Sequence, residues 1–165
     1  MRRSLVLLSL VLAGCTGLPQ RAPQQPEAGR AWLEAHNAYR AQHGAAPLVW
    51  SDKLAASAQR VADSCPTDHS STPYGENMAW VSVPKTEAQI VGYWYAEEPL
   101  YAYDRAEFSA ETGHFTQLVW RNTQALGCGQ ASGCNTRISN VWICHYDPPG
   151  NYRGQFGENV LPKGR

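Results

Sequence analysis

Four side chains that could do chemistry stand in separate segments of the chain. They are two histidines and two glutamates: His69, Glu76, Glu97 and His114. Two imidazoles and one carboxylate are the protein ligands of several catalytic zinc sites, which keep an open position for water. The remaining carboxylate could act as a general base, so Glu76 and Glu97 are the candidate catalytic residues. Spacing alone does not join the four, because the sequence has no His-Glu-x-x-His pair on one helix face.

His114 opens the stretch GHFTQLVWRNT, residues 113–123. The apolar residues Phe115, Leu118 and Val119 recur at helical spacing, which predicts a helix with one buried face. A buried apolar face does not need an imidazole. The histidine therefore indicates a site at the start of this helix.

Glu97 and Glu98 fall at the end of another predicted helix, which opens at Thr86 and should end near Glu98 because Pro99 follows. Carboxylates at a helix carboxyl terminus oppose the macrodipole, which favours cations there. An exposed glutamate loses little in this position. A less exposed Glu97 would need a compensating cation, and a protonated histidine or a bound metal would serve.

Further helices and two strands must position these side chains. Helical spacing predicts one helix over 32–42, and Ser51 or Asp52 caps another that runs to Ser64. Residues 126–129 and 140–146 have the pattern of strands. Helices followed by short strands favour an α+β fold, with helices packed on a small antiparallel sheet.

The amino terminus has the features of an export signal. Two arginines precede the apolar run 5–13, and Leu-Ala-Gly-Cys follows at 12–15. This stretch resembles a bacterial lipobox, so we expect a signal peptide over 1–14 and acylation of Cys15; ordinary signal cleavage is the alternative. Residues 15–28 are rich in proline and glutamine and predict a tether. The expected domain is 29–165, exported and anchored to a membrane of the bacterial cell envelope.

The cysteine count supports export. Of five cysteines, a lipid-bearing Cys15 leaves four, which in an exported domain predict two disulfides with three possible connectivities. If the connection between the two strands centres on Thr136, the two residue numbers in each facing pair sum to 272. Cys128 then faces Cys144. Cys65 would then pair with Cys134, although a single bulge would shift this register.

Charge excludes one class of partner. The chain has 14 Lys and Arg against 14 Asp and Glu, a formal net charge of +0. Loss of the two arginines with the signal leaves 12 basic and 14 acidic residues, a net of −2. No run of basic residues is present, so no nucleic-acid partner is expected.

Five ordered motifs resemble the CAP superfamily, which comprises cysteine-rich secretory proteins, antigen five and plant pathogenesis-related proteins of group one. The resemblance spans nearly all of 31–162. The motifs are HNAYR at 36–40, YGENMA at 74–79, WYAE at 94–97, GHFTQLVWRNT at 113–123 and CHYDPPGNY at 144–152.

The resemblance implies a three-layer α-β-α sandwich with a cleft formed by His69, Glu76, Glu97 and His114. It implies that this cleft can bind a divalent metal, zinc above all, whereas no general hydrolase activity follows. A second Gly-Glu-Asn triplet at 157–159 competes with residues 75–77, and only motif order favours Glu76 over Glu158. A family disulfide across 108–113 is missing, so the loop before His114 is expected to be looser.

Several functions remain open from sequence. We expect a ligand-binding or interaction module with a metal-capable cleft, and a metal-dependent hydrolase using the same cleft is an alternative. A lipid- or sterol-binding protein is another, for which the aromatic stretch at 93–103 is the candidate surface. The purely structural alternative is a network of hydrogen-bonded charges that only holds the four segments together. Whether the protein is an enzyme is left open.

Overall fold

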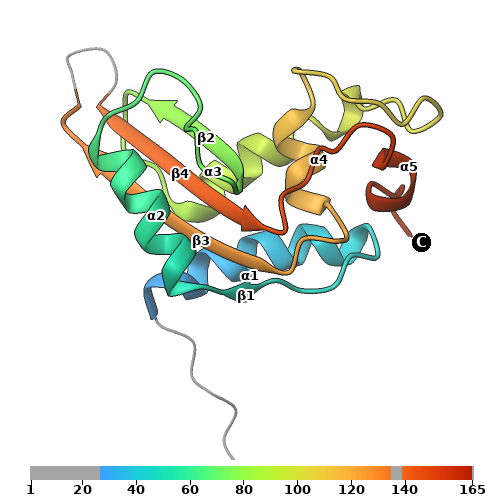
Figure 1. Cartoon of the computed structure of the whole chain (residues 1–165), viewed down its shortest axis with the longest axis horizontal. Coiled ribbons are helices and arrows are strands. Elements are labelled where there is room, and N and C mark those ends of the chain that lie inside the picture. The colour runs from blue at the N-terminus through green and yellow to red at the C-terminus, as the bar shows by residue number, and fades with distance from the viewer. Residues whose placement is uncertain (1–26, 135–138, 165) are drawn as a thin grey trace, which may run out of the picture.

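The computed structural model describes residues 27–134 and 139–164. The chain forms three layers around a sheet (Figure 1). The helix α2 (Asp52–Asp63) covers one face of the sheet. The other face carries three helices: α1 (Glu27–Gln42), α3 (Glu87–Tyr95) and α4 (Gly113–Val119). The expected α+β fold, an α-β-α sandwich, is confirmed.

The helix starts follow local sequence signals. The Ser51 side chain caps α2 by accepting a hydrogen bond from the Leu54 amide. Thr86 caps α3 through a reciprocal capping box with Gln89. α3 ends at Tyr95, somewhat earlier than expected, and a 3-10 turn (Glu98–Leu100) with proline inside it follows. A last short helix, α5, spans Phe156–Asn159.

The sheet has four strands in the order β1-β3-β4-β2. The strands β3 (Ala125–Ser132) and β4 (Asn140–Asp147) pair in antiparallel fashion, as expected. β2 (Gly75–Val81) adds to β4, and the two-residue strand β1 (Val49–Trp50) pairs in parallel with β3, so the sheet is mixed. Neither edge strand was predicted from the sequence, because β1 is too short to show a period and β2 opens with polar residues that belong to a site.

The disulfides are those expected from the hairpin register. Cys128 lies directly opposite Cys144 in the β3–β4 ladder and is bonded to it. Cys65 is bonded to Cys134, which ties the end of α2 to the end of β3. The register predicted from sequence is therefore confirmed, with no bulge between the paired residues.

A buried arginine joins α1 to the end of α4 and to the connecting segments beside it. Arg40 of α1 is fully buried, and its guanidinium donates to the carbonyls of Ala46, Leu118, Trp120 and Thr123 at 2.8 to 3.1 Å. Two of these carbonyls, those of Leu118 and Trp120, lie at the carboxyl end of α4, where the helix itself leaves carbonyls unbonded. Burial lowers the pKa of Arg40 to about 10, so the side chain remains charged at neutral pH.

Within 27–134 and 139–164, no helix has the length and apolar content needed to span a bilayer. The expected signal peptide, the lipidation site at Cys15 and nearly all of the expected tether lie outside the described residues. Helix α1 begins at Glu27, two residues before the expected domain start.

Candidate functional site

A cleft of about 420 Å³ opens beside the start of α4. His69, Glu76 and His114 line it together with Asn77 and Asn151. Three of the four residues singled out from sequence thus come together in one cavity. The fourth, Glu97, is not among the lining residues and instead contacts His114.

The first histidine of the cleft is held by Glu76. The Nδ1 atom of His69 lies 2.8 Å from Glu76 Oε1, which also accepts the Ser70 amide at 2.9 Å. The other carboxylate oxygen accepts the Ser70 hydroxyl at 2.5 Å and lies 3.0 Å from Nε2 of His145. Four hydrogen bonds therefore occupy both oxygens of Glu76.

These contacts fix the charge of the Glu76 carboxylate. Burial by itself would raise its pKa, but hydrogen bonds from His145, His69 and Ser70 outweigh burial and hold the pKa well below its usual range. The hydrogen bond to Glu76 raises the pKa of His69. Glu76 is therefore an ionised carboxylate at neutral pH.

The second histidine is held by Glu97. The Nδ1 atom of His114 lies 2.6 Å from Glu97 Oε1, and Glu97 Oε2 accepts the amides of His114 and Phe115, both at 3.0 Å. The compensation expected for this carboxylate comes from the two backbone amides in the first turn of α4 and from the His114 imidazole that lies against it. Glu98, the neighbour that sequence could not dismiss, instead pairs with Lys163 at 3.0 Å.

A fifth residue, His145, belongs to the site and was not predicted. It lies directly opposite Glu76 in the β2–β4 ladder, and its side chain is fully buried. Because its Nε2 faces an ionised carboxylate, that atom carries the proton. Its Nδ1 is buried and has no hydrogen-bond partner among the described residues. The only signal in the sequence was the histidine of the CHYDPPGNY motif, which is uninformative until β2 is placed.

Polar residues of α4 hold the loop after β4 against the cleft. The Thr116 hydroxyl donates to Asn151 Oδ1 at 2.6 Å, and Asn151 Nδ2 donates to the Gly113 carbonyl at 2.9 Å. The Gln117 side chain accepts the Gly150 amide at 2.8 Å. These contacts explain why a buried helix carries polar residues in its middle, and they position Asn151 on the cleft wall.

A chain of buried hydrogen bonds runs from the cleft to α1. Asn77 Nδ2 donates to the His114 carbonyl at 3.0 Å and to the Tyr146 hydroxyl at 3.2 Å. That hydroxyl lies 2.9 Å from Nε2 of His36, whose Nδ1 lies 2.8 Å from the Trp32 carbonyl. Burial lowers the pKa of His36 to about 4, so this imidazole is neutral at neutral pH.

The hydrogen bonds indicate which atoms could hold a metal ion. Each cleft histidine places Nδ1 on a carboxylate, which leaves its Nε2 as the nitrogen with a lone pair. Metal-ligating histidines are commonly oriented in this way by a carboxylate on the other ring nitrogen. The oxygens of Glu76 and Glu97 already accept hydrogen bonds, so both glutamates suit orientation better than ligation.

Two imidazoles that line one cleft are ligands of the type that a metal ion such as zinc prefers. Across the described ranges no group of three or more His, Cys, Asp or Glu is arranged to hold a metal. The four residues predicted from sequence form two separate His–Glu pairs, and the structure does not gather them as four ligands of one ion.

The structure shows which of the two Gly-Glu-Asn triplets belongs to the cleft. Glu76 lies in β2 and contacts two histidines, whereas Glu158 is an exposed residue of α5 and does not line the cleft. Asn159, next to it, is buried and accepts the Asn122 amide at 3.0 Å. The second triplet thus helps to hold the carboxyl-terminal segment in place and is not part of the cleft.

Comparison with known proteins agrees with this architecture. A family model described as "Cysteine-rich secretory protein family" matches residues 33–146. Pathogenesis-related protein 1 of Arabidopsis thaliana is 36% identical over 157 residues, covering 93% of this chain and 94% of the relative. The solved structure of BmVAL-1 superposes with a TM-score of 0.71 at 23% identity, over 90% of this chain and 89% of that one. The crystal structure of NaASP2 with Zn2+ has a TM-score of 0.64 at 23% identity, over 86% and 92%.

Proposed function

Because the chain belongs to the cysteine-rich secretory protein family, we propose that it is an exported ligand-binding or interaction domain whose cleft binds a divalent metal ion. The ligands are the Nε2 atoms of His69 and His114. The observation that carries the proposal is that both imidazoles place Nδ1 on a carboxylate, Glu76 for one and Glu97 for the other.

Zinc is the ion that best suits this pair of ligands. Imidazole nitrogen is a preferred zinc ligand, and a carboxylate on the far ring nitrogen increases its basicity. NaASP2, which shares the fold, has a crystal structure with Zn2+. Here the two glutamates would orient the imidazoles, and Asn77 would support the backbone of His114 from behind.

Binding is better supported than hydrolysis. A bound zinc ion would supply a Lewis acid and lower the pKa of a coordinated water. A hydrolase would also need a general base, and the candidates Glu76 and Glu97 both have their oxygens engaged by protein donors. A metal-dependent hydrolase therefore remains the less supported alternative.

A lipid- or sterol-binding role has weaker support than the metal site. Within the aromatic stretch 93–103, Trp94 and Tyr101 are buried in the core, whereas Tyr93 and Leu100 are exposed. The buried members are explained by packing. The two exposed residues do not by themselves define a groove for a neutral lipid.

Anchoring to a membrane of the bacterial cell envelope through acylated Cys15 is part of the proposal and rests on the Leu-Ala-Gly-Cys stretch. The variant Cys15→Ser is expected to leave the membrane fraction and remain folded. Membrane retention of that variant would contradict the anchor.

Calorimetric titration of zinc into the purified domain tests the metal site. The titration is best done above about pH 8, because the pKa of His69 is raised and a protonated imidazole cannot bind the ion. His69→Ala and His114→Ala should each lower the affinity by more than about tenfold, since each removes one ligand. Glu76→Gln should weaken binding by removing the orienting carboxylate.

Glu158→Gln is the matched control, since it makes the same chemical change in the second Gly-Glu-Asn triplet. It should bind zinc as the unmodified domain does. Undiminished binding after both histidine changes, or equal losses from Glu76→Gln and Glu158→Gln, would place the ion elsewhere. Absence of zinc binding by the unmodified domain would leave the structural network as the role of these residues.

A further inference from the structure

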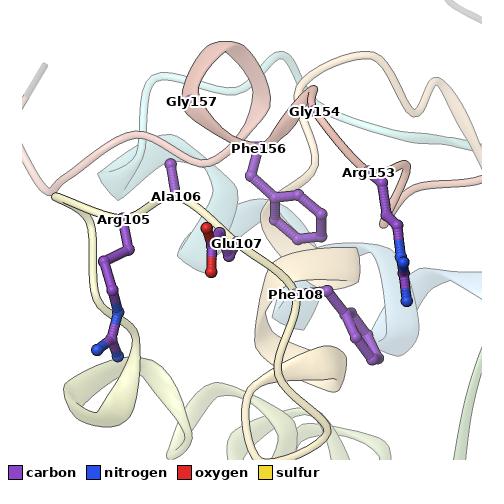
Figure 2. Close-up of a pocket in the computed structure, with 8 residues that line it drawn as sticks. All are labelled: Arg105, Ala106, Glu107, Phe108, Arg153, Gly154, Phe156 and Gly157. Atoms are coloured by element: carbon purple, nitrogen blue, oxygen red, sulfur yellow. The ribbon is translucent and has the colours of Figure 1, made fainter.

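A second cavity of about 580 Å³ lies beside the metal cleft. Its walls are the loop 105–108 and the carboxyl-terminal segment 153–157, which face each other in Figure 2. Phe108 lines both this cavity and the metal cleft, so it separates the two. The volume is within the range of sites for small organic ligands.

The charged residues of this cavity have no role in folding that the structure reveals. Arg105, Glu107 and Arg153 are all exposed. In the described part of the chain none of the three forms a salt bridge or a side-chain hydrogen bond. Two guanidinium groups and one carboxylate give the cavity a net charge of +1, which complements a monoanion.

Phe108 supplies an apolar wall, and the buried ring of Phe156 lies beside it. Phe156 is 1% exposed and packs edge-on against Trp120, with ring centroids 5.0 Å apart. Phe108 is 51% exposed, and its ring centroid lies 6.4 Å from that of Phe156. The Phe156 ring points into the space between the two segments, whereas Arg105 and Arg153 lie at opposite ends of it (Figure 2). One ring is thus fixed by the core, and the other is left partly open to solvent.

We propose that this cavity binds a small amphipathic monoanion. An aromatic or aliphatic body would cover Phe108 beside Phe156, and a carboxylate or sulfonate group would pair with a guanidinium. Covering a half-exposed phenylalanine removes apolar surface from water, which favours binding. Glu107 repels a second negative charge, so polyanions are disfavoured. The site does not depend on the metal proposed for the neighbouring cleft.

Dye binding tests the proposal with a charged probe and a neutral one. The anionic probe is 8-anilinonaphthalene-1-sulfonate, and the neutral probe is N-phenyl-1-naphthylamine, which has the same rings without the sulfonate. Phe108→Ala should weaken the binding of both probes, because both lose the apolar wall. Arg105→Gln together with Arg153→Gln should weaken the anionic probe by at least about threefold and leave the neutral probe unchanged, as expected for exposed ion pairs.

Arg60→Gln is the matched control, because it removes an exposed arginine of α2, which lies on the opposite face of the sheet. It should change the binding of neither probe, and the affinity for the anion should be the same with zinc and with a chelator. The proposal is overturned if the native protein binds no anionic probe, if Phe108→Ala binds it normally, or if Arg60→Gln weakens it as much as the cavity arginines do. Stronger binding of the neutral probe than of the anion would point to a neutral lipid and would also overturn it.

Discussion

At the residue scale, two histidines are oriented by two carboxylates in different ways. Glu97 is held by the backbone amides at the start of α4, whereas Glu76 is held by Ser70 and by the buried His145. Backbone amides at a helix start carry partial positive charge. In the Glu76 pair a second imidazole supplies the extra donor.

We predict that His145→Phe lowers zinc affinity although His145 is not a ligand. Glu76 loses one donor and holds His69 less firmly, and changes in such supporting residues typically cost about 10- to 100-fold in metal affinity. Loss of the same donor next to a buried carboxylate should lower the free energy of unfolding by about 1–3 kcal/mol. Zinc titration and denaturant unfolding measure the two effects.

The conservative variant His145→Gln offers a side-chain N–H donor and should recover part of the zinc affinity. A His145→Phe protein that is destabilised yet binds zinc normally would limit His145 to a structural role.

At the element scale, the close approach of α2 to β3 depends on missing side chains. A Cβ atom at Gly129 would lie 2.5 Å from the Cα atom of Gln59, and one at Gly127 would contact the backbone nitrogen of Ala55. Both neighbours are helix backbone, which cannot move aside as a flexible side chain would. The glycines of β3 therefore set the distance between the outer helix and the sheet, and the Cys65–Cys134 disulfide closes the same layer.

We predict that Gly127→Ala lowers the free energy of unfolding by about 1–3 kcal/mol, because the added methyl group forces α2 away from the sheet. Gly92→Ala is the control, since a Cβ atom there would meet only the Tyr39 hydroxyl at 3.7 Å and alanine favours the helix by up to about 1 kcal/mol. Urea unfolding of both variants checks the prediction. If the two variants were equally stable, α2 could move away from the sheet without loss of stability, and the prediction would be wrong.

At the scale of the whole molecule, buried polar groups connect the layers. The chain from Asn77 through Tyr146 to His36 joins the cleft, the sheet and α1. His36 must remain neutral because it is surrounded by protein and lies near the charge of Arg40. The stability of the entire fold is therefore coupled to pH through a residue that is remote from solvent.

We predict that acid destabilises the protein partly through His36. Burial lowers its pKa to about 4, whereas in the unfolded chain it takes its ordinary value of about 6.5. Between these values the unfolded state binds a proton that the folded state excludes, so stability falls as pH falls. The loss due to this group between pH 7 and pH 4.5 is about 2–3 kcal/mol.

Urea unfolding at a series of pH values, in the unmodified protein and in His36→Gln, measures this contribution. The variant should lose less stability between pH 7 and pH 4.5, whatever its stability at neutral pH. The low pKa of Glu76 also makes acid destabilising, and the raised pKa of His69 acts in the opposite direction, but both are present in the two proteins. Parallel pH curves would contradict the assignment to His36.

The sequence by itself determined the features that depend on neighbouring residues or on a single hairpin. Ser51 and Thr86 cap helices where their side chains can reach amides three residues ahead, a purely local interaction. The Cys128–Cys144 pairing followed from counting along one hairpin, because the register of two sequential strands depends on the connection between them. The ordered motifs sufficed to predict the family and the sandwich.

Only the tertiary structure decided how the site is built. Glu76 and His145 are far apart in sequence and meet because β2 pairs with β4, a register that no local pattern encodes. The choice of Glu97 over Glu98 likewise depends on which carboxylate faces the start of α4. Residue types and spacing indicate which side chains could belong to a site. The atoms that each carboxylate binds depend on packing between distant segments.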